Sequence, residues 1–160
     1  MECDKDVIID IKTLVWEVEA IITEGYKDGN LPSKFMDNFY VVTALQMEDK
    51  IEMRKLKDLV LEKATHRKGA VTTIRSMQLA PLKVAEGLTG FQSGCMPPIC
   101  HTNRDMDLYV DKSILDVVQS QSSTNGTNIF ASIGSGIHGK SLVLPLRQFL
   151  RVAGVNWEAT

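Results

Sequence analysis

The chain lacks the long apolar runs, the signal sequence and the paired cysteines that mark several large classes of protein. Its apolar runs are far too short to cross a bilayer, which excludes a membrane-spanning helix. Residues 1–6 lack the basic start and apolar core of a secretory signal peptide. Three cysteines, an odd number in no framework spacing, argue against a disulfide scaffold and for a reducing compartment. We therefore expect a soluble cytoplasmic protein.

An excess of charge of one sign is also missing. The 18 basic and 20 acidic residues give a formal net charge of −2, so the whole chain has no nucleic-acid signature. A hydrophobic fraction of 44% and a charged fraction of 24% are typical of globular proteins. At 160 residues the chain fits one domain, and we expect residues 1–160 to form it.

The pattern of apolar residues predicts an α+β protein with a core built largely of sheet. A β-branched run at 7–18 predicts one strand or two adjoining strands, and a second run at 20–23 predicts a short strand. A turn at 24–30 and a long connection at 31–38 are expected to follow. Further strands are predicted at 39–45, 71–74, 107–111, 129–133 and 141–144. Helical spacing predicts a helix over 53–69, and shorter helices over 79–88, 112–118 and 145–152.

Metal and nucleophile signatures are weak. Cys95, Cys100 and His101 cluster, but a structural zinc site takes four ligands and no second ligand pair follows, so we predict neither metal nor cofactor. A catalytic thiol would need Cys95 or Cys100 beside His101 or His138, which the sequence leaves open. No G-x-S-x-G motif of a serine hydrolase occurs.

Residues 134–141 match the phosphate-binding string G-x4-G-K-[S/T] letter for letter. In nucleoside triphosphatases a helix follows this string and directs its N-terminus at the phosphates. Here a β-like run and Pro145 follow instead. The context favours a turn between two strands of a hairpin, with a nucleoside triphosphatase as the remote alternative.

Two other segments allow two interpretations each. The G-x3-P loop from Gly94 to Pro98 combines a glycine amide with stiff prolines, so it is either an oxyanion hole or a proline-braced surface turn. The basic residues of the 53–69 helix either complement the dipole at its C-terminus or form a phosphate-contacting patch. They are Arg54, Lys55, Lys57, Lys63, Arg67 and Lys68.

Four short motifs, taken in order, resemble the YbaK-like aminoacyl-tRNA deacylases, which are related to the editing domain inserted in bacterial prolyl-tRNA synthetases. Lys12-Thr13-Leu14 is similar to the family's Lys-Thr-Leu strand, and the segment from Arg54 resembles its central helix. Thr89-Gly90-Phe91 with the loop at 94–98 resembles the T-G-[FY] and G-x3-P loop. Residues 130–134 leading into 142–144 resemble its terminal strand pair. The resemblance covers nearly the whole chain from about Val7.

The resemblance implies a mixed, largely antiparallel sheet that forms a barrel-like core with surrounding helices. It implies hydrolysis, in trans, of the ester between a mischarged amino acid and the 3′ adenosine of tRNA, without a dedicated protein nucleophile. Water attacks with help from a hydroxyl or thiol of the substrate. Lys12 would lie near the substrate's terminal phosphate or α-amine, and the Gly94 to Pro98 loop would bind the carbonyl oxygen. The implied partners are the acceptor end of tRNA and an aminoacyl-tRNA synthetase, with no membrane and no DNA.

The site residues implied by the resemblance fall into three groups. Lys12, Gly94 and Pro98 would be catalytic. The substrate would contact Thr13, Phe91, Cys95, Met96, Pro97, His101, Ser132, Gly134 and His138. The acceptor stem would contact Arg54, Lys55, Lys63, Arg67 and Lys68.

The sequence departs from the family in three places. Only eleven residues precede Lys12, so we expect the usual N-terminal element to be missing. Residues 24–38 resemble an insertion, and Gln148 stands where many members carry an acidic residue. The alternative function is therefore a non-catalytic tRNA-binding or synthetase-associated module with the same fold.

Overall fold

The computed structural model describes residues 6–24, 29, 33–68, 71–121 and 127–155. The strands are β1 (Val7–Glu24), β2 (Ser33–Gln46), β3 (Val71–Leu79), β4 (Asp107–Val110), β5 (Ile129–Gly134) and β6 (Ser141–Pro145). The helices are α1 (Met53–Lys68), α2 (Leu82–Thr89), α3 (Lys112–Gln121) and α4 (Leu146–Val152). Among the described residues, no helix combines the length and the apolar character needed to cross a membrane.

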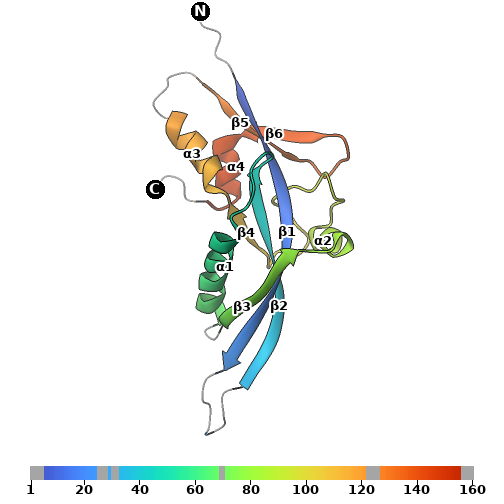
Figure 1. Ribbon diagram of the computed structural model, residues 1–160. Coiled ribbons are helices and arrows are strands. Elements are labelled where there is room, and N and C mark those ends of the chain that lie inside the picture. The colour runs from blue at the N-terminus through green and yellow to red at the C-terminus, as the bar shows by residue number, and fades with distance from the viewer. Residues whose placement is uncertain (1–5, 25–28, 30–32, 69–70, 122–126, 156–160) are drawn as a thin grey trace, which may run out of the picture.

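One mixed sheet contains all six strands and curls into a half-barrel (Figure 1). Its order is β4-β2-β1-β5-β6, and β3 also pairs with β1. The β1–β2, β1–β3 and β5–β6 pairs are antiparallel, whereas β1–β5 and β2–β4 are parallel. This confirms the predicted fold class, a mixed, largely antiparallel sheet with helices around it.

β1 is the central strand, and its two edges differ. One edge pairs with β2 from Ile11 to Glu24 without interruption. The other edge is shared, because residues 7–10 pair with β5 and pairing with β3 begins only at Trp16. Val15 still accepts a hydrogen bond from the Ala80 amide at 2.9 Å. Residues 11–14 have no strand on this edge within the described ranges, which leaves a gap in the sheet.

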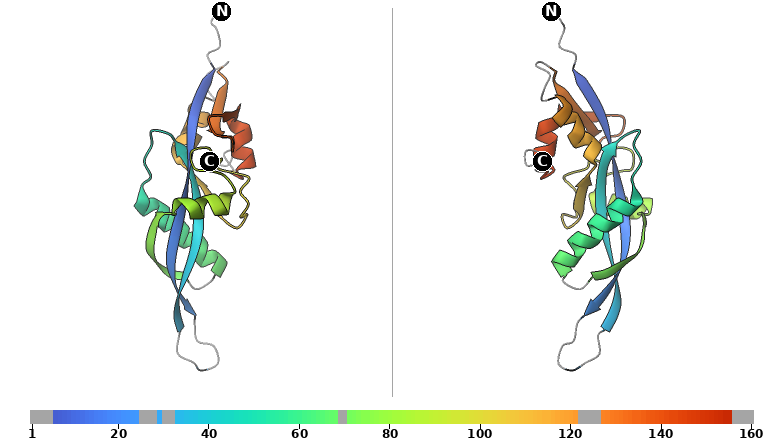
Figure 2. Two further views of the ribbon diagram at one scale, coloured as in Figure 1. Left: turned by 90° about the vertical axis from the view of Figure 1, so that its right-hand side faces the viewer. Right: turned by 60° about the vertical axis from the view of Figure 1, so that its left-hand side comes forward.

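Helices cover opposite faces of the β1–β2 ribbon, as Figures 1 and 2 show. Trp16 and Val18 pack against Leu56 and Val60 of α1. Val15, which points to the other face because side chains alternate along a strand, packs with Val42, with Ala85 of α2 and with Met96. A third cluster places α3 and α4 against β1 and β5 through Ile9, Ile11, Ala131, Ile133, Ile114 and Phe149.

Some predicted boundaries are wrong. The expected connection at 31–38 is strand from Ser33 onward, because this polar segment is ordered by pairing with residues 19–24 of β1 rather than by burying its own side chains. The pair lies at the projecting end of the sheet, and Phe35 and Met36 are 44% and 46% exposed there (Figure 2). The third strand extends to Leu79, which pairs with Trp16, so the helix predicted from 79 begins at Leu82 after Pro81.

Candidate active site

A cavity of about 220 Å³ lies at the gap in the pairing of β1. Strand β1, the end of β3, helix α2 and the loop after α2 all contribute to its wall. The lining residues are Thr13, Leu14, Val15, Leu79, Ala80, Leu82, Ala85, Ser93 and Met96. The strand and the G-x3-P loop that carry two of the sequence motifs therefore meet at one cavity.

The start of the loop is fixed by hydrogen bonds to α2. Thr89, fully buried at the end of this helix, donates its hydroxyl to the Ala85 carbonyl at 2.8 Å and accepts from the Phe91 amide at 3.3 Å. The Gly90 amide caps the helix by donating to the Glu86 carbonyl, and the Ser93 amide donates to the Glu86 carboxylate at 3.0 Å. The chain therefore reaches Gly94 from a rigid base.

Gly94 adopts the left-handed conformation, with φ at +88°. This conformation is strained for residues with a side chain, which explains why glycine occupies the first position of the G-x3-P motif. Gly94 is exposed, and within the described part of the chain its amide and that of Met96 have no protein acceptor. Two main-chain donors of the loop are thus available to a ligand.

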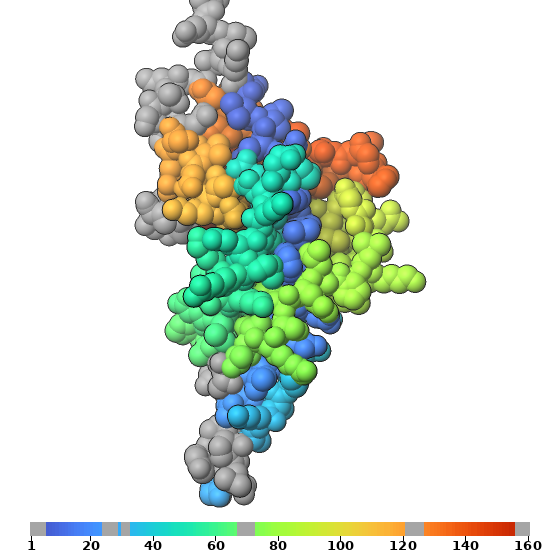
Figure 3. All heavy atoms as spheres, in the orientation of Figure 1, coloured from blue at the N-terminus to red at the C-terminus, as the bar shows by residue number. Residues whose placement is uncertain are grey.

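The turn between β5 and β6 closes against this loop (Figure 3). A Cβ at Gly134 would lie 2.5 Å from the Met96 carbonyl oxygen and 2.6 Å from that of Cys95, so only glycine permits the contact. The Gly136 amide donates to the Cys95 carbonyl at 2.8 Å. A Cβ at Gly136 would lie 2.7 Å from the Phe91 ring, and one at Gly94 would lie 4.0 Å from the His138 ring. Phe91, Cys95, Met96, Gly134 and His138 are therefore brought together.

Pro97 and Pro98 of the loop, and His101 after it, are not in the cavity lining. Both prolines are buried, and Pro98, predicted to be catalytic, lines a separate cavity together with Cys100 and His101. The His101 ring Nε2 is 2.6 Å from the Pro97 carbonyl oxygen. Burial lowers the pKa of His101 below its usual 6.5, and the hydrogen bond to Pro97 opposes this shift. We assign these residues to bracing the loop.

The predicted cysteine and serine residues make mainly structural contacts. The buried Cys95 thiol donates to the Gln92 carbonyl at 3.2 Å. Ser132, buried in β5, lies in register with Asp10 of β1 and Val143 of β6. In the described ranges no cysteine–histidine hydrogen bond is present, and no three metal-ligating side chains gather at one point.

Among the described residues, Thr13 carries a buried side-chain oxygen that the fold leaves without a hydrogen-bond partner. Its Oγ1 is buried and has no hydrogen-bond partner among the described residues. Thr43 on the neighbouring strand is buried too, but its hydroxyl accepts from the Trp16 indole at 2.9 Å. An unsatisfied buried hydroxyl costs about 1–3 kcal/mol. Such an atom in a cavity wall is a candidate contact for a ligand.

Lys12 does not line the cavity that its neighbour lines. The Lys12 amine donates to the carbonyls of Met47 and Asp49, each at 2.7 Å, in the connection between β2 and α1. Alternation along β1 puts it on the face of Trp16, which packs against α1, while Thr13 faces the Gly94 loop. The structure does not bring the Lys12 amine and Gly94 to one cavity, and the substrate contact of Lys12 stays a prediction.

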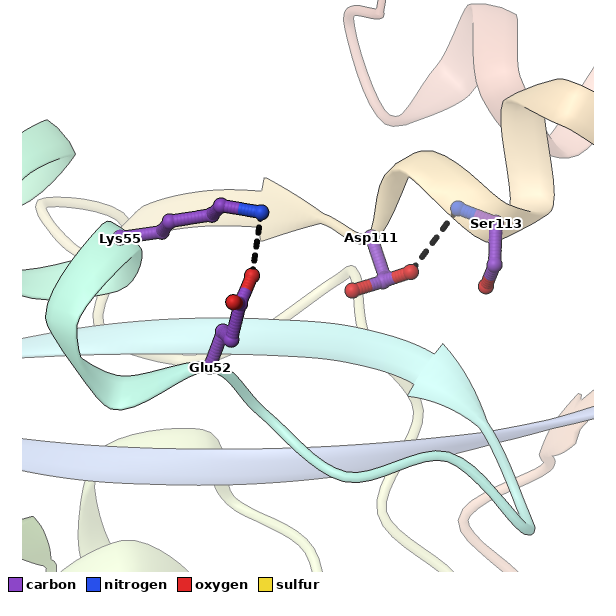
Figure 4. A network of polar contacts seen from close by, with 4 residues as sticks. All are labelled: Glu52, Lys55, Asp111 and Ser113. Carbon is purple, nitrogen blue, oxygen red and sulfur yellow. Dashed lines mark hydrogen bonds and ion pairs between the residues drawn. The ribbon is translucent and has the colours of Figure 1, made fainter.

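The basic residues predicted to bind tRNA lie on α1, across the sheet from the cavity. Arg54 is exposed, Lys55 pairs with Glu52, and Lys63 pairs with Asp107 at 2.9 Å. Figure 4 shows the Lys55–Glu52 pair near Asp111, whose carboxylate accepts a hydrogen bond from the Ser113 amide at 2.8 Å. The hydrogen bond from Lys55 to Glu52 raises the pKa of Lys55.

The side chains of Arg67 and Lys68 lie outside the described part of the structure, so their predicted tRNA contacts are not placed. Two other lysines are exposed on elements near the cavity, one on α2, which contributes to the cavity wall, and one in the β5–β6 turn, which contacts the Gly94 loop. Lys83 is exposed on α2, and Lys140 is exposed in the turn that carries His138. Each stands alone in the sequence, so no charge run pointed to them.

The string at 134–141 is a hairpin turn, as predicted. Gly134 ends β5 and Ser141 begins β6, so a strand rather than a helix follows the string. The Ser135 hydroxyl donates to the Lys140 carbonyl at 2.9 Å and accepts from the Ile137 amide, which fills the turn with internal hydrogen bonds. The helix N-terminus that a phosphate-binding loop needs is not present here.

No protein-family model matches the chain, and no curated protein matches it. One similar solved structure is described as "Crystal structure of a putative trans-editing enzyme for prolyl tRNA synthetase". It has a TM-score of 0.51 and 18% identity, and the alignment covers 92% of this chain and 66% of that chain. This chain therefore spans slightly less than two thirds of that protein. At this identity the likeness shows a shared fold.

Two further solved structures match at lower TM-scores. A protein from work described as "Epitope backbone grafting by computational design for improved presentation of linear epitopes on scaffold proteins" has a TM-score of 0.48 and 17% identity, with 92% of this chain and 67% of that chain covered. Hypothetical protein APE2540 has a TM-score of 0.45 and 18% identity, and the alignment covers 86% of this chain and 69% of that chain.

Proposed function

We propose that this chain is an aminoacyl-tRNA deacylase that hydrolyses, in trans, the ester between a mischarged amino acid and the 3′ end of tRNA. The observation that carries the proposal is the cavity of about 220 Å³ beside a rigid G-x3-P loop in which the amides of Gly94 and Met96 have no acceptor among the described residues. A cavity of this size suits a small acyl group. The shared fold with a protein described as a trans-editing enzyme supports the same function.

The mechanism uses main-chain groups, because the cavity lining contains no titratable side chain. The amides of Gly94 and Met96 donate to the carbonyl oxygen of the ester as it gains negative charge in the transition state. Each such donor is worth about 2.7–4 kcal/mol of transition-state stabilisation. Water attacks the carbonyl carbon, and the 3′ hydroxyl of the terminal adenosine leaves. Gly134 supports this geometry by letting the β5–β6 turn close on the loop.

The partner that we propose is the acceptor end of tRNA, reached from the side of α2 and the β5–β6 turn. Lys83 and Lys140 are exposed on these two elements and would contact phosphates next to the terminal adenosine. The basic residues of α1 lie across the sheet, so they would meet a more distant part of the tRNA or a synthetase.

The test is deacylation of a panel of mischarged tRNAs by the full chain and by Gly94→Ala. We expect Gly94→Ala to lower the rate roughly 10²–10³-fold, because the strained residue displaces the loop amides. Gly154→Ala is the matched control, since Gly154 also has a positive φ, of +74°, but follows α4 and has no atom near its missing Cβ. Wild-type protein that leaves every ester intact, or a Gly154→Ala effect as large as that of Gly94→Ala, contradicts the proposal.

A second candidate function is tRNA binding without turnover. The hydrogen bonds of Lys12 favour this function. Its amine donates to two main-chain carbonyls and therefore supplies no free cation to the cavity. Filter binding of mischarged and uncharged tRNA, run beside the deacylation assay, separates the two functions. The binding module retains tRNA and hydrolyses none of the esters.

A further inference from the structure

Thr13 presents several hydrogen-bonding groups to the gap in the sheet at once. The Asp10 carbonyl accepts from the Met47 amide at 2.9 Å, so residue 10 directs its peptide groups toward β2. The Val15 carbonyl accepts from the Ala80 amide at 2.9 Å, so residue 15 directs its groups toward the opposite edge. Because this direction alternates along a strand, Thr13 directs its peptide groups to the edge where no strand pairs with it.

The Thr13 hydroxyl is a second acceptor on the same residue. It is buried without a partner in the described part of the structure, and Thr13 itself lines the cavity. The other residues of β1, β3 and α2 in the lining are apolar, from Leu14 and Val15 to Leu82. A polar ligand group seated against β1 therefore finds its hydrogen-bond acceptors at Thr13, and the other hydroxyl in the lining, that of Ser93, lies across from β1 on the loop.

We propose that Thr13 is a specificity-determining residue, whose hydroxyl and main-chain carbonyl together hold the α-amino group of the acyl substrate. This inference rests on the proposed function. In an aminoacyl ester the α-amine is bound to the carbon next to the reacting carbonyl, and Thr13 and Met96 line the same cavity. An amine held at Thr13 therefore places the carbonyl near the loop amides.

The chemistry of the wall favours an amine over other groups. The two Thr13 oxygens accept hydrogen bonds, which an amine donates, and no cation lines the cavity to repel it. An N-acylated or peptidyl ester has one donor left and carries added bulk in a small space. The site thus selects esters with a free amine and rejects esters with a blocked one.

The test compares three substrates that differ at the α position: alanyl, lactyl and N-acetylalanyl esters of the same tRNA. In the lactyl ester a hydroxyl replaces the amine. Wild-type protein should prefer the alanyl ester. Thr13→Val should lower kcat/KM for the alanyl ester on the order of 10- to 100-fold and change the lactyl and N-acetylalanyl rates less than about twofold. Thr13→Ser, which keeps a hydroxyl, should restore the preference.

Stability provides a readout that a structural role would not give. Removal of an unsatisfied buried hydroxyl should leave the Tm of Thr13→Val equal to or above that of the wild type. Thr43→Val is the matched control, because it removes a satisfied hydroxyl, the acceptor for Trp16, and should lower the Tm without changing the alanyl-to-lactyl ratio. Equal loss on all three esters in Thr13→Val overturns the inference.

A binding assay keeps the inference separate from the proposed function. Alaninamide and lactamide are titrated into the full chain and into Thr13→Val, with NMR shifts of the Thr13 and Met96 amides as the signal. Tighter binding of alaninamide, lost at least about tenfold in Thr13→Val, supports the inference even if no ester is hydrolysed. Binding that is absent from the wild type, or identical in the two proteins, overturns it.

Discussion

The two faces of the β1–β2 ribbon treat their polar groups differently. On the α1 face the Trp16 indole bonds Thr43, the Lys12 amine bonds two carbonyls, and Lys63 pairs with Asp107. On the opposite face the Thr13 hydroxyl and the amides of Gly94 and Met96 have no protein partner among the described residues. Satisfied buried groups stabilise a fold, whereas unsatisfied ones are tolerated where a ligand completes them. The contrast puts the unsatisfied groups, and with them the function that we propose, on the face opposite α1.

The largest expected effect comes from Gly134→Ala, which disrupts the contact between the β5–β6 turn and the Gly94 loop on the face opposite α1. Its Cβ would lie 2.5 Å and 2.6 Å from the carbonyl oxygens of Met96 and Cys95, so the loop must move. We expect a loss of about 1–3 kcal/mol in the free energy of unfolding by urea. Because the loop amides move with the clash, deacylation should fall roughly 10²–10³-fold.

The control for this change is Gly87→Ala in α2. No atom lies within 4 Å of the Cβ that would be added there, and its φ is not in the positive range. Alanine is the better helix former, so the free energy of unfolding should rise by about 0.5–1 kcal/mol with an unchanged rate. A Gly134→Ala protein with wild-type stability and rate would show that the close approach of loop and turn is unimportant.

The next largest effect compares the stability of two variants in which a threonine is replaced by valine, one on each face of the ribbon. Thr43→Val leaves the buried Trp16 N–H without its acceptor, and we expect a loss of about 1–3 kcal/mol in the free energy of unfolding. Thr13→Val removes a hydroxyl that has no partner and should cause no loss. Urea titrations of the two single variants measure both values. Equal destabilisation by the two substitutions would erase the distinction between the faces.

A smaller effect is expected from the protonation of His101 behind the loop. Burial, the larger cause, lowers its pKa below 6.5, so the unfolded chain binds this proton more readily than the folded chain. Stability from the neutral ring is therefore complete above about pH 6.5 and declines as the pH falls below that value. Thermal unfolding from pH 7.5 to pH 5 measures this, and His101→Gln should show a shallower decline of Tm. Parallel curves for the two proteins would contradict the assignment.

Much of the fold could be predicted because most strands and helices of this chain have a recognisable pattern in their own residues. The β-branched run of β1 and the apolar spacing of α1 predicted these elements from neighbouring residues alone. Residues 33–38 were missed because their strand is induced by β1, and polar residues such as Lys34 and Asp37 carry no local signal for pairing. Elements whose own residues show a strand or helix pattern were predicted correctly. The segment 33–38, which is a strand because it pairs with β1, was not predicted.

The site could be predicted only in part, for two physical reasons. Period-two alternation makes Lys12 and Thr13 point to opposite faces, and the motif that contains both does not say which face holds the cavity. The contact of Gly134 with Met96 joins residues far apart in the chain, and only the folded sheet brings them within contact. The loop itself was found because glycine and proline restrict the backbone locally.

The smallest expected effect tests which face meets the acceptor end of tRNA. Lys140→Gln, in the β5–β6 turn that contacts the Gly94 loop, should lower the slope of log affinity against log salt by about 1, because one phosphate contact is lost. Arg54→Gln removes an equally exposed charge from α1 and should leave the slope unchanged. Filter binding of one tRNA at several salt concentrations gives both slopes. If Arg54→Gln alone changes the slope, tRNA binds the α1 face as the resemblance implied, and the acceptor end would then have to cross the sheet edge to reach the cavity.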